Sequence, residues 1–533
     1  MRSSGWVATT LVSFASLVIA IPRIPAMPKQ PAIEWQPEAG GLHAQAGLVE
    51  YFFDQLLDHT DPSCGTFKQR FWFSEDYYKP GGPIILFNAG EEDASGFTGY
   101  LQNRTITGAI AYATGGATIV MEHRYWGKSN PFANYTTANM KYLTVYNAVQ
   151  DYAYFAQNVE LPWAAGAKVT PPPTTAWILN GGSYPGSLTA YAKQTFPDLF
   201  YAAYATSAPV QICTILRCFA VQCSVARSFG YFIPVAAGAP QNCSTDMMRV
   251  ITHWDEVMSQ GTAAEKSDMM ALFGLGNVTH EADASSALIE APWSWQALGP
   301  AVGAHQQFFD FCDMLETNNS VIAGPDGFGV EYATSKWAEW QVAFSKKCAA
   351  CVVPTSIMTT GKISHGHSLV FSISSSWGTY DGNSSTYTDT QIGFWQDGNP
   401  TGPSIVSKQV TAAYWEIQCP LYFPPENGVS VPAEAPVDEI NDAYGGWDMT
   451  EDHLLFVNGE FDPWRSGTVS SLLPDAPVRQ STDTQPILLI KNGGHCWDMI
   501  TGTAMANPDT RVVFNQVVAT MVNWMDEWHA ARA

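Results

Sequence analysis

The sequence predicts an α/β fold in which helices cover both faces of a mostly parallel sheet. Short, continuous apolar runs recur along the chain, which is the pattern of strands buried on both sides. Segments with helical periodicity stand between these runs, as in repeated strand–helix units. Each run ends at a cluster of Gly, Asn or charged residues, so we expect strands over 83–87, 117–121, 176–180, 201–207, 454–457 and 487–490.

The pattern changes in the middle of the chain. From about residue 213 to 444, helix-like segments rich in Trp and Phe replace the alternating strands and helices. We interpret this part as a mainly helical domain inserted into the α/β domain. The expected organisation is a signal peptide over 1–20, a flexible or pro-segment over 21–46, the first part of the α/β domain over 47–210, the helical insertion over 211–444, and the second part of the α/β domain over 445–533.

The N-terminus has the features of an export signal. Arg2 supplies a positive charge, residues 6–20 are largely apolar, and small residues near Ala20 offer a cleavage site. The alternative is a membrane anchor, but the run is shorter than the ~20 residues that a spanning helix needs. A secreted glycoprotein also agrees with six Asn-x-Ser/Thr sequons, at Asn103, Asn134, Asn242, Asn277, Asn318 and Asn383. We expect a secreted, extracellular protein, with a vacuolar or lysosome-like compartment as the alternative, and no membrane attachment after signal cleavage.

Charge and cysteine content narrow the function classes. The chain has 26 Lys and Arg against 49 Asp and Glu, a formal net charge of −23. We expect no nucleic-acid partner, because phosphate contacts need clustered basic residues. Ten cysteines in an exported chain indicate structural disulfides. The Cys348-Ala-Ala-Cys351 spacing would suggest zinc or redox chemistry in a cytosolic protein, and the pairing of the cysteines stays open.

The stretch around Ser183 indicates a nucleophile elbow. An apolar run stops at Gly181-Gly182-Ser183, and the residues that follow can continue as a helix. Such a strand-to-helix turn lifts a serine hydroxyl above the sheet edge, and glycines are needed because the tight turn has no room for Cβ atoms. The simpler alternative is an ordinary Gly-Ser turn.

Two further strand ends carry the partners that a serine nucleophile needs. Asp462 follows the predicted strand at 454–457, and His495 follows the strand at 487–490. Ser, Asp and His occur in the chain order of α/β-hydrolases, with His495 as the base and Asp462 as the acid that orients it. Glu460 and Asp498 are the weaker candidates for the acid.

Other motifs give weaker indications of function. His365-Gly366-His367 could bind metal, but no third ligand stands at a recognisable spacing, so we expect a solvated loop, no metal site and no cofactor. His123 stands at a strand end, where we expect hydrogen bonds that support the site.

The motifs together resemble the S28 family of serine peptidases, which includes lysosomal prolyl carboxypeptidase, dipeptidyl peptidase II and fungal acid prolyl endopeptidases. The resemblance covers most of the chain from about Glu50. It implies an α/β-hydrolase fold with an inserted helical cap, and cleavage of proline-containing peptides after proline, often at acid pH. The motifs that carry it are 122–127 (EHRYWG), 181–186 (GGSYPG), 458–464 (NGEFDPW) and 493–495 (GGH).

The resemblance also assigns site residues. The family's catalytic triad falls on Ser183, Asp462 and His495. The backbone N–H of Tyr184 would be one oxyanion donor, with another near Gly90. Candidates for supporting the site or contacting substrate are Glu91, Glu122, Arg124 and Trp464.

Three features depart from the family pattern. Pro185 stands two residues after the serine, where a small residue is usual, and we expect altered packing there without loss of the nucleophile. The cysteine-rich piece 212–228 is longer than expected. The family pattern has a Trp-rich stretch with a Cys-x-Glu, and residues 388–393 leave no room for it. The sequence therefore does not determine the cap disulfides or part of the substrate pocket.

The leading hypothesis is a secreted serine-type peptidase that acts on proline-containing peptides through an acyl-enzyme. The alternatives are a carboxylester hydrolase on the same fold and a catalytically inactive secreted glycoprotein. The sequence leaves open whether the enzyme is a carboxypeptidase, a dipeptidyl peptidase or an endopeptidase, and it leaves the oligomeric state open.

Overall fold

The computed structural model of the chain describes residues 48–163, 171–212, 228–301, 306–347, 395–417, 420, 423–430, 432 and 436–533. Several expectations lie outside these residues. They are the signal peptide, the 21–46 segment, residues 213–227 of the cysteine-rich piece, the sequon at Asn383, the Cys348–Cys351 pair, the His365–His367 pair and the stretch 388–393.

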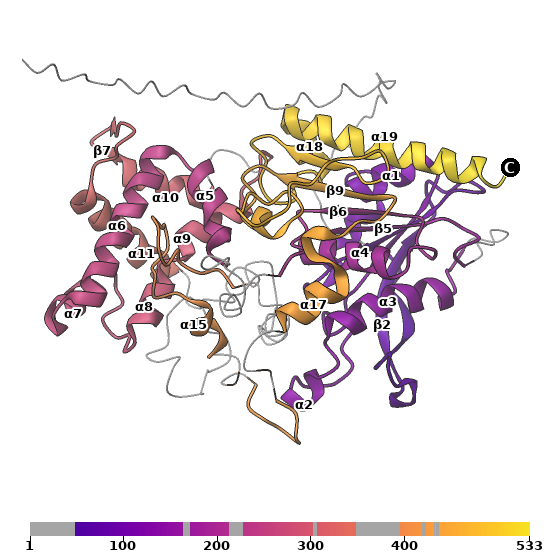
Figure 1. Cartoon of the computed structure of the whole chain (residues 1–533), viewed down its shortest axis with the longest axis horizontal. Helices are drawn as coiled ribbons and strands as arrows, with labels where there is room; N and C mark the ends of the chain where they lie inside the picture. Colours follow the sequence, from indigo (N-terminus) through magenta and orange to yellow (C-terminus); the bar gives the residue numbers. More distant parts are fainter. Residues whose placement is uncertain are drawn as a thin grey trace, which may run out of the picture. The chain divides into compact units, whose positions relative to one another are not determined.

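An eight-stranded sheet forms the centre of the α/β part, in the order β1-β2-β4-β3-β5-β6-β9-β10 (Figure 1). The first two strands form an antiparallel hairpin, β2 pairs antiparallel with β4, and all other neighbours are parallel. The six apolar runs of the sequence are strands of this sheet, which confirms the α/β fold. The strands are β1 (Tyr51–Leu56), β2 (Thr66–Ser74), β3 (Ile84–Asn88), β4 (Ala117–Met121), β5 (Trp177–Gly182), β6 (Ala202–Thr206), β9 (Leu454–Gly459) and β10 (Ile487–Ile490).

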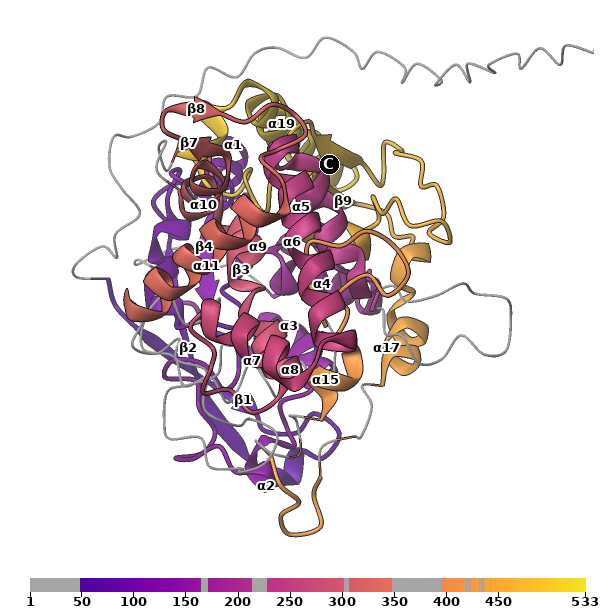
Figure 2. The ribbon, with the colours of Figure 1, turned by 90° about the vertical axis from the view of Figure 1, so that its left-hand side faces the viewer.

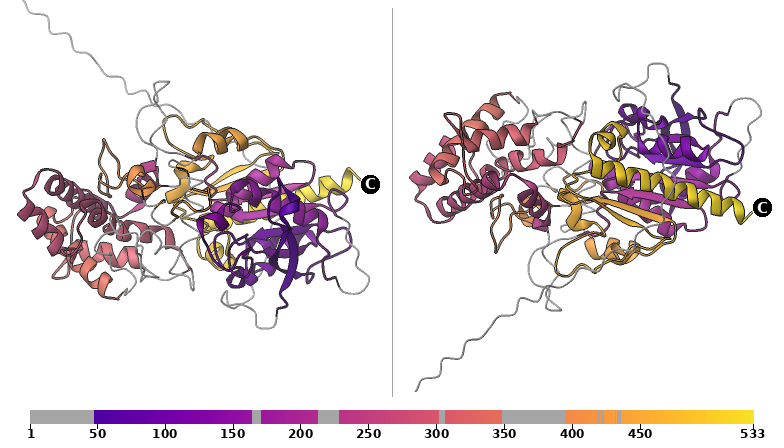
Figure 3. Two further views of the ribbon diagram at one scale, coloured as in Figure 1. Left: turned by 90° about the horizontal axis from the view of Figure 1, so that it is seen from below. Right: turned by 90° about the horizontal axis from the view of Figure 1, so that it is seen from above.

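Helices bury both faces of the sheet because successive strand side chains point to opposite sides. One face packs against α1, α18 and α19, and the long α19 runs along the sheet in the right-hand view of Figure 3. The other face packs against α3, α4 and α17. The bounds are η1 (Pro62–Cys64), η2 (Ala94–Leu101), α1 (Ile106–Thr114), α2 (Thr137–Met140), α3 (Val145–Asn158), α4 (Tyr184–Thr195), α17 (Val437–Tyr444), η6 (Gly446–Asp448), η7 (Pro463–Gly467), α18 (Thr501–Ala506) and α19 (Pro508–Ala530).

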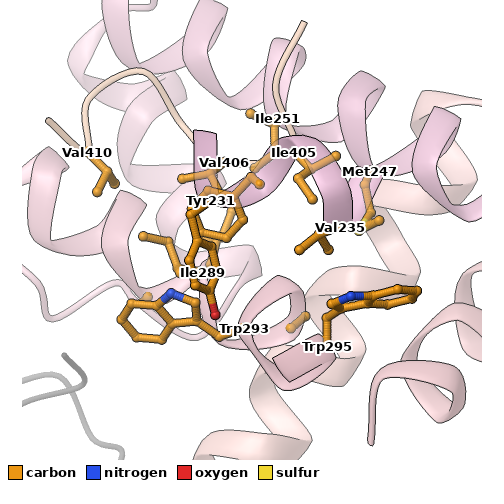
Figure 4. Packing of buried hydrophobic residues seen from close by; sticks show 14 of the residues in the cluster. Tyr231, Val235, Met247, Ile251, Ile289, Trp293, Trp295, Ile405, Val406 and Val410 are labelled. Atoms are coloured by element: carbon orange, nitrogen blue, oxygen red, sulfur yellow. The ribbon is translucent and has the colours of Figure 1, made fainter. Parts of the chain in front are cut away.

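Between β6 and α17 the described elements are helical apart from a short hairpin, and in Figure 2 the helices α5 to α11 face the viewer. They enclose their own apolar core, in which Trp and Ile side chains such as Trp293, Trp295 and Ile289 interlock (Figure 4). The bounds are η3 (Ser228–Tyr231), α5 (Phe232–Gly238), α6 (Gln241–Gln260), α7 (Ala263–Leu272), α8 (Glu281–Ala287), α9 (Glu290–Trp293), η4 (Ser294–Ala297), α10 (Gln307–Glu316), β7 (Thr317–Asn318), β8 (Val321–Ile322), α11 (Val330–Lys347) and α15 (Ala412–Glu416).

A disulfide between Cys243 and Cys312 joins α6 to α10. It closes a loop of 69 residues, a length for which chain-entropy arguments predict a substantial restriction of the unfolded state. Within the described part of the chain, Cys64 and Cys496 are unpaired.

The sequons differ in accessibility. Asn134, Asn277 and Asn318 are exposed and Asn242 is half-buried. Asn103 is only 8% exposed, and its backbone N–H donates to the Tyr77 hydroxyl at 3.2 Å. A bulky glycan on Asn103 would require local unfolding, so this sequon is the least suited of the described ones to modification. In the described residues, no helix has the length and apolar character needed to cross a membrane.

Candidate active site

Ser183 occupies the sharp turn between β5 and α4. Its backbone has φ 61° and ψ −136°, a region that costs strain for a residue with a side chain. The turn is held because the Ser183 N–H donates to the Thr206 carbonyl on β6 at 2.9 Å. A Cβ on Gly181 would lie 2.2 Å from the Pro185 oxygen, and one on Gly182 would lie 2.2 Å from Met499 Sδ. The two glycines are therefore needed for the tight packing of the turn.

Asp462 and His495 meet at the ends of β9 and β10. His495 Nδ1 lies 2.9 Å from Asp462 Oδ1, and Asp462 is fully buried. The same oxygen accepts the backbone N–H of Trp464 at 2.9 Å, which fixes the carboxylate at the start of η7. Among the described residues, no donor contacts the other oxygen, Oδ2.

The carboxylate determines the charge state of the imidazole. Burial alone would lower the pKa of His495, but the charge and the hydrogen bond of Asp462 outweigh it, with a contribution from Cys496, and the pKa lies well above its ordinary value. The bond to Nδ1 leaves Nε2 as the nitrogen that can exchange a proton with another group.

The two weaker acid candidates are engaged elsewhere. Glu460 accepts the Asn492 backbone N–H at 2.8 Å. Asp498 is fully buried and accepts hydrogen bonds from the hydroxyls of Tyr204 and Thr206. Of the three carboxylates, Asp462 is the one that is hydrogen-bonded to His495.

The end of β6 links the serine turn to the histidine loop. Thr206 accepts the Ser183 N–H through its carbonyl and donates its hydroxyl to Asp498 at 2.8 Å. The next residue, Ser207, is buried and accepts the backbone N–H of Cys496 at 2.9 Å. Sequence reasoning missed both residues, although their place at the end of the strand that follows the elbow helix was a usable signal.

We expect Ser207→Ala to lower kcat with little change in KM. The substitution leaves the Cys496 N–H without its acceptor, at a cost of about 1–3 kcal/mol, and it loosens the loop that holds His495. A roughly 10-fold drop in kcat, with a displaced pH profile, is the expected result in steady-state peptide assays.

Ser285→Ala is the matched control for that variant. Ser285 is also buried, and its hydroxyl oxygen accepts the indole N–H of Trp254 at 2.9 Å within the helical part. It should cost comparable stability and leave kcat unchanged. Equal kcat values for Ser207→Ala and the wild type would contradict the positioning role.

Gly90 does not present a free amide, contrary to expectation. Its N–H donates to Asn88 Oδ1 at 2.8 Å, so this group is already satisfied. The glycine is required for another reason: its φ is +73°, and a Cβ there would lie 2.2 Å from Pro185 Cγ. Pro185, the unusual residue of the elbow, thus packs directly against this loop.

Glu91 lies beside the histidine. Burial raises the pKa of its carboxyl to about 7, and the charge of His495 acts in the opposite direction. Burial, together with the charge of Glu91, raises the pKa of Glu92 to about 7 as well. Both carboxyls are therefore largely neutral in acid solution.

Glu122 supports the loops around the site and is not accessible to a substrate. It is fully buried and forms an ion pair with Arg70. It also accepts the N–H of Ala94 at 3.0 Å and the hydroxyl of Ser129 at 2.7 Å. Of the two roles expected for Glu122, support of the site agrees with this burial and substrate contact does not.

Arg124 is likewise fully buried, and it forms a two-pronged pair with Asp151 at 2.6 and 2.8 Å. Its remaining donors go to backbone carbonyls of 56, 57 and 142, so it fastens the β1–β2 hairpin to α3. A substrate contact at Arg124 is excluded by the same burial.

His123 and Trp464 support the site in different ways. His123 Nδ1 lies 2.8 Å from the Arg124 carbonyl oxygen, so Nδ1 is the protonated ring nitrogen and donates this hydrogen bond. The other nitrogen, Nε2, accepts a hydrogen bond from the Tyr184 hydroxyl at 3.2 Å. Burial lowers the pKa of His123 to about 4, so the ring is neutral. Trp464 is half-buried, and its indole N–H donates to Gln296 Oε1 at 2.9 Å.

In the described part of the chain, no group of three His, Cys, Asp or Glu side chains is arranged to hold a metal ion. The arrangement at the sheet edge instead offers a hydroxyl, an imidazole and a carboxylate. Together with the sheet order and the strained serine turn, it defines the molecule as an α/β-hydrolase.

The chain belongs to the S28 family of serine peptidases. The family model described as serine carboxypeptidase S28 matches residues 55–229 and 379–515, more than half of the chain. The protein is therefore a serine-type peptidase, as the motifs predicted.

Relatives span nearly the whole chain. Serine protease vicPa of Bipolaris victoriae is 33% identical over 90% of this chain and 89% of its own length. A probable extracellular serine carboxypeptidase of Arthroderma benhamiae is 26% identical, covering 87% of this chain and 64% of its own. The thymus-specific serine protease of Mus musculus is 26% identical over 92% of each chain. Among solved structures, a proline iminopeptidase of Mycobacterium smegmatis aligns with 86% of this chain and 96% of its own at 10% identity, with a TM-score of 0.34.

Proposed function

We propose that Ser183, His495 and Asp462 form the catalytic triad of a secreted peptidase that cleaves after proline. The observation that carries the proposal is the hydrogen bond between His495 Nδ1 and buried Asp462, at the sheet edge that also carries the strained Ser183 turn. Family membership supports the peptidase chemistry.

The reaction follows from the roles of the three groups. His495 Nε2 takes the proton of Ser183 as the hydroxyl oxygen attacks the scissile carbonyl, and the histidine then gives that proton to the leaving amine. Water hydrolyses the resulting acyl-enzyme by the same proton route. Asp462 holds the imidazole in the required tautomer and stabilises its positive form.

The oxyanion would be stabilised by a backbone amide. Tyr184 is the first residue of α4, where the N–H has no acceptor within the helix, and the helix N-terminus favours negative charge. Because the Gly90 N–H is satisfied by Asn88 and the Glu91 backbone amide hydrogen-bonds its own carboxyl group, Tyr184 is the one backbone donor that we assign. The Glu91 side chain, neutral below about pH 7, would not oppose the developing negative charge in acid solution.

Proline selectivity and acidic working conditions rest on the family resemblance. Trp464 offers a half-buried aromatic ring next to Asp462, and a flat apolar face suits the rigid pyrrolidine ring. The substrate class is therefore peptides with proline on the acyl side of the cleaved bond.

The test uses two internally quenched peptides that differ only in having Pro or Ala before the cleaved bond. The expected result, at the pH of highest activity between about pH 4 and 8, is cleavage after Pro, with a kcat/KM at least ~100-fold above that for Ala. Comparable turnover of both peptides would contradict the proline selectivity. Faster turnover of an acyl ester than of either peptide would favour an ester hydrolase.

A fluorophosphonate probe distinguishes an enzyme from an inactive glycoprotein. Covalent labelling at Ser183 is expected, because the probe reacts only with an activated serine. Absence of labelling in the folded protein would contradict the catalytic assignment.

Secretion is supported by the relative from Arthroderma benhamiae, whose name includes "extracellular", and by the exposed sequons. N-terminal sequencing of the mature protein after expression in a fungal host should find the first residue downstream of Ala20. A mature chain that still begins at Met1 would contradict it.

A further inference from the structure

A cavity of about 330 Å³ lies between the helical part and the loops that carry Asp462 and His495. One side of the lining comes from η4, α10 and neighbouring residues, and the other comes from the ends of β9 and β10. The lining residues are Gly238, Trp295, Leu298, Gly299, Pro300, Gln306, Phe309, Phe461, Asn492, Gly494 and Trp497.

The walls are aromatic, and two of their polar groups are already satisfied. The Trp295 indole N–H donates to the Phe461 carbonyl at 2.8 Å, and the Trp497 indole N–H donates to the Leu298 carbonyl at 2.7 Å. Both bonds cross between the helical part and the α/β part, so they fix the two sides of the cavity against each other. With the indole nitrogens engaged, the rings offer apolar surface, and such a preformed cavity favours an apolar occupant.

The cavity is directly beside the proposed catalytic groups. Phe461 precedes Asp462 in the chain, and Gly494 precedes His495. A Cβ on Gly494 would lie 2.6 Å from Trp497 Nε1, so the glycine allows the indole to line the cavity close to the histidine.

The histidine indicates which part of a substrate reaches the cavity. His495 must protonate the leaving amine, so the residue that contains this amine passes over the histidine loop. Asn492, Gly494 and Trp497 of this loop line the cavity. The leaving-group side of the substrate is therefore the side within reach of it.

We propose that this cavity is a specificity subsite for a large apolar side chain, aromatic by preference, on the leaving-group side of the cleaved bond. The inference rests on the proposed function, because it takes His495 as the group that protonates the leaving amine. An aromatic ring can pack against Trp295, Phe309 and Trp497, whereas a charged side chain would lose its hydration there and meet no residue of opposite charge in the lining.

The experiment uses two sets of internally quenched peptides with a fixed Ala-Pro before the bond. In the first set the residue directly after the bond is Phe, Leu, Ala or Asp, and in the second set the next residue is varied in the same way. One of the two sets should show kcat/KM for Phe roughly 10- to 100-fold above Ala, with Asp lowest.

Two variants of Phe309 test whether the cavity causes this preference. Phe309 is half-buried, and its ring centroid is 6.4 Å from that of Trp295. Phe309→Ala removes part of the wall and should reduce the Phe-over-Ala preference at least 5-fold. Phe309→Trp narrows the cavity and should slow cleavage of the Phe peptide more than cleavage of the Ala peptide.

Phe344→Ala is the matched control, because Phe344 is a half-buried aromatic residue of the same helical part, stacked on Trp340 outside the cavity. It should retain the wild-type preference. Cleavage of the peptides with no preference on the leaving-group side, or a preference that Phe309→Ala and Phe309→Trp leave unchanged, would overturn the inference. Failure of the wild type to cleave any of the peptides would instead count against the proposed function.

Discussion

We expect Ser183→Ala to reduce peptide hydrolysis by roughly 10⁴- to 10⁶-fold, the range found when the nucleophile of a serine triad is removed. The fold should survive, because the Ser183 side chain forms no capping hydrogen bond to α4. The strained backbone of the turn is imposed by the glycines and by the Thr206 carbonyl, which alanine does not alter. The measurement is kcat/KM on a proline-containing peptide, with the melting temperature recorded for both proteins.

Ser187→Ala provides the matched control within the same helix. Ser187 is buried one turn further along α4, and its hydroxyl donates to the Pro209 carbonyl at 3.1 Å. This variant loses a hydrogen bond that Ser183→Ala does not lose, so it should be the less stable of the two and keep most of its activity. Unchanged turnover in Ser183→Ala would remove the basis of the catalytic assignment.

Asp462→Asn should lower kcat/KM about 10⁴-fold and move the acid limb of the profile of kcat/KM against pH to lower pH. The negative charge and hydrogen bond of Asp462 raise the pKa of His495 against the opposing effect of burial. Removing the charge lowers that pKa, so the imidazole becomes neutral, and able to act as a base, at a lower pH. The rate nevertheless falls, because an amide no longer stabilises the imidazolium or holds the correct tautomer.

The measurement is kcat/KM against pH from about 4 to 8 for the wild type and Asp462→Asn. Asparagine can still accept the Trp464 N–H through its side-chain oxygen, so the start of η7 should stay in place. Glu460→Gln is the control, because Glu460 stands on the same loop but binds the Asn492 backbone. A larger loss in Glu460→Gln than in Asp462→Asn, or an acid limb that does not move, would contradict the assignment.

Much of the fold could be predicted because local patterns agree with the tertiary structure. The runs at 176–179 and 454–457 are apolar at every position, as is typical of strands covered on both faces, and they lie in β5 and β9. Parallel strands place their carboxyl ends at one edge, so the residues that follow them were predicted to gather there.

The supporting residues could not be predicted in the same way. Glu122 and Arg124 have the charged side chains expected of substrate-binding groups, yet both are fully buried and paired within the protein. Their partners Arg70 and Asp151 are far away in the sequence, and no local pattern indicates which charges become neutralised by burial. Ser207 was missed for the same reason, since its bond to Cys496 spans 289 positions.

The sequence by itself determined the parallel sheet, the serine turn and the family, because apolar periodicity, glycines in a tight turn and ordered motifs are local properties of the chain. Only the tertiary structure decided which carboxylate is bonded to His495, that the Gly90 amide is occupied, and that an aromatic cavity lies beside the histidine loop. The bond to His495 and the cavity depend on groups that are remote in sequence, and folding alone brings such groups within hydrogen-bonding or packing distance. The Gly90 amide is bonded to Asn88, two residues before it, in a side-chain contact that apolar periodicity and motifs do not specify.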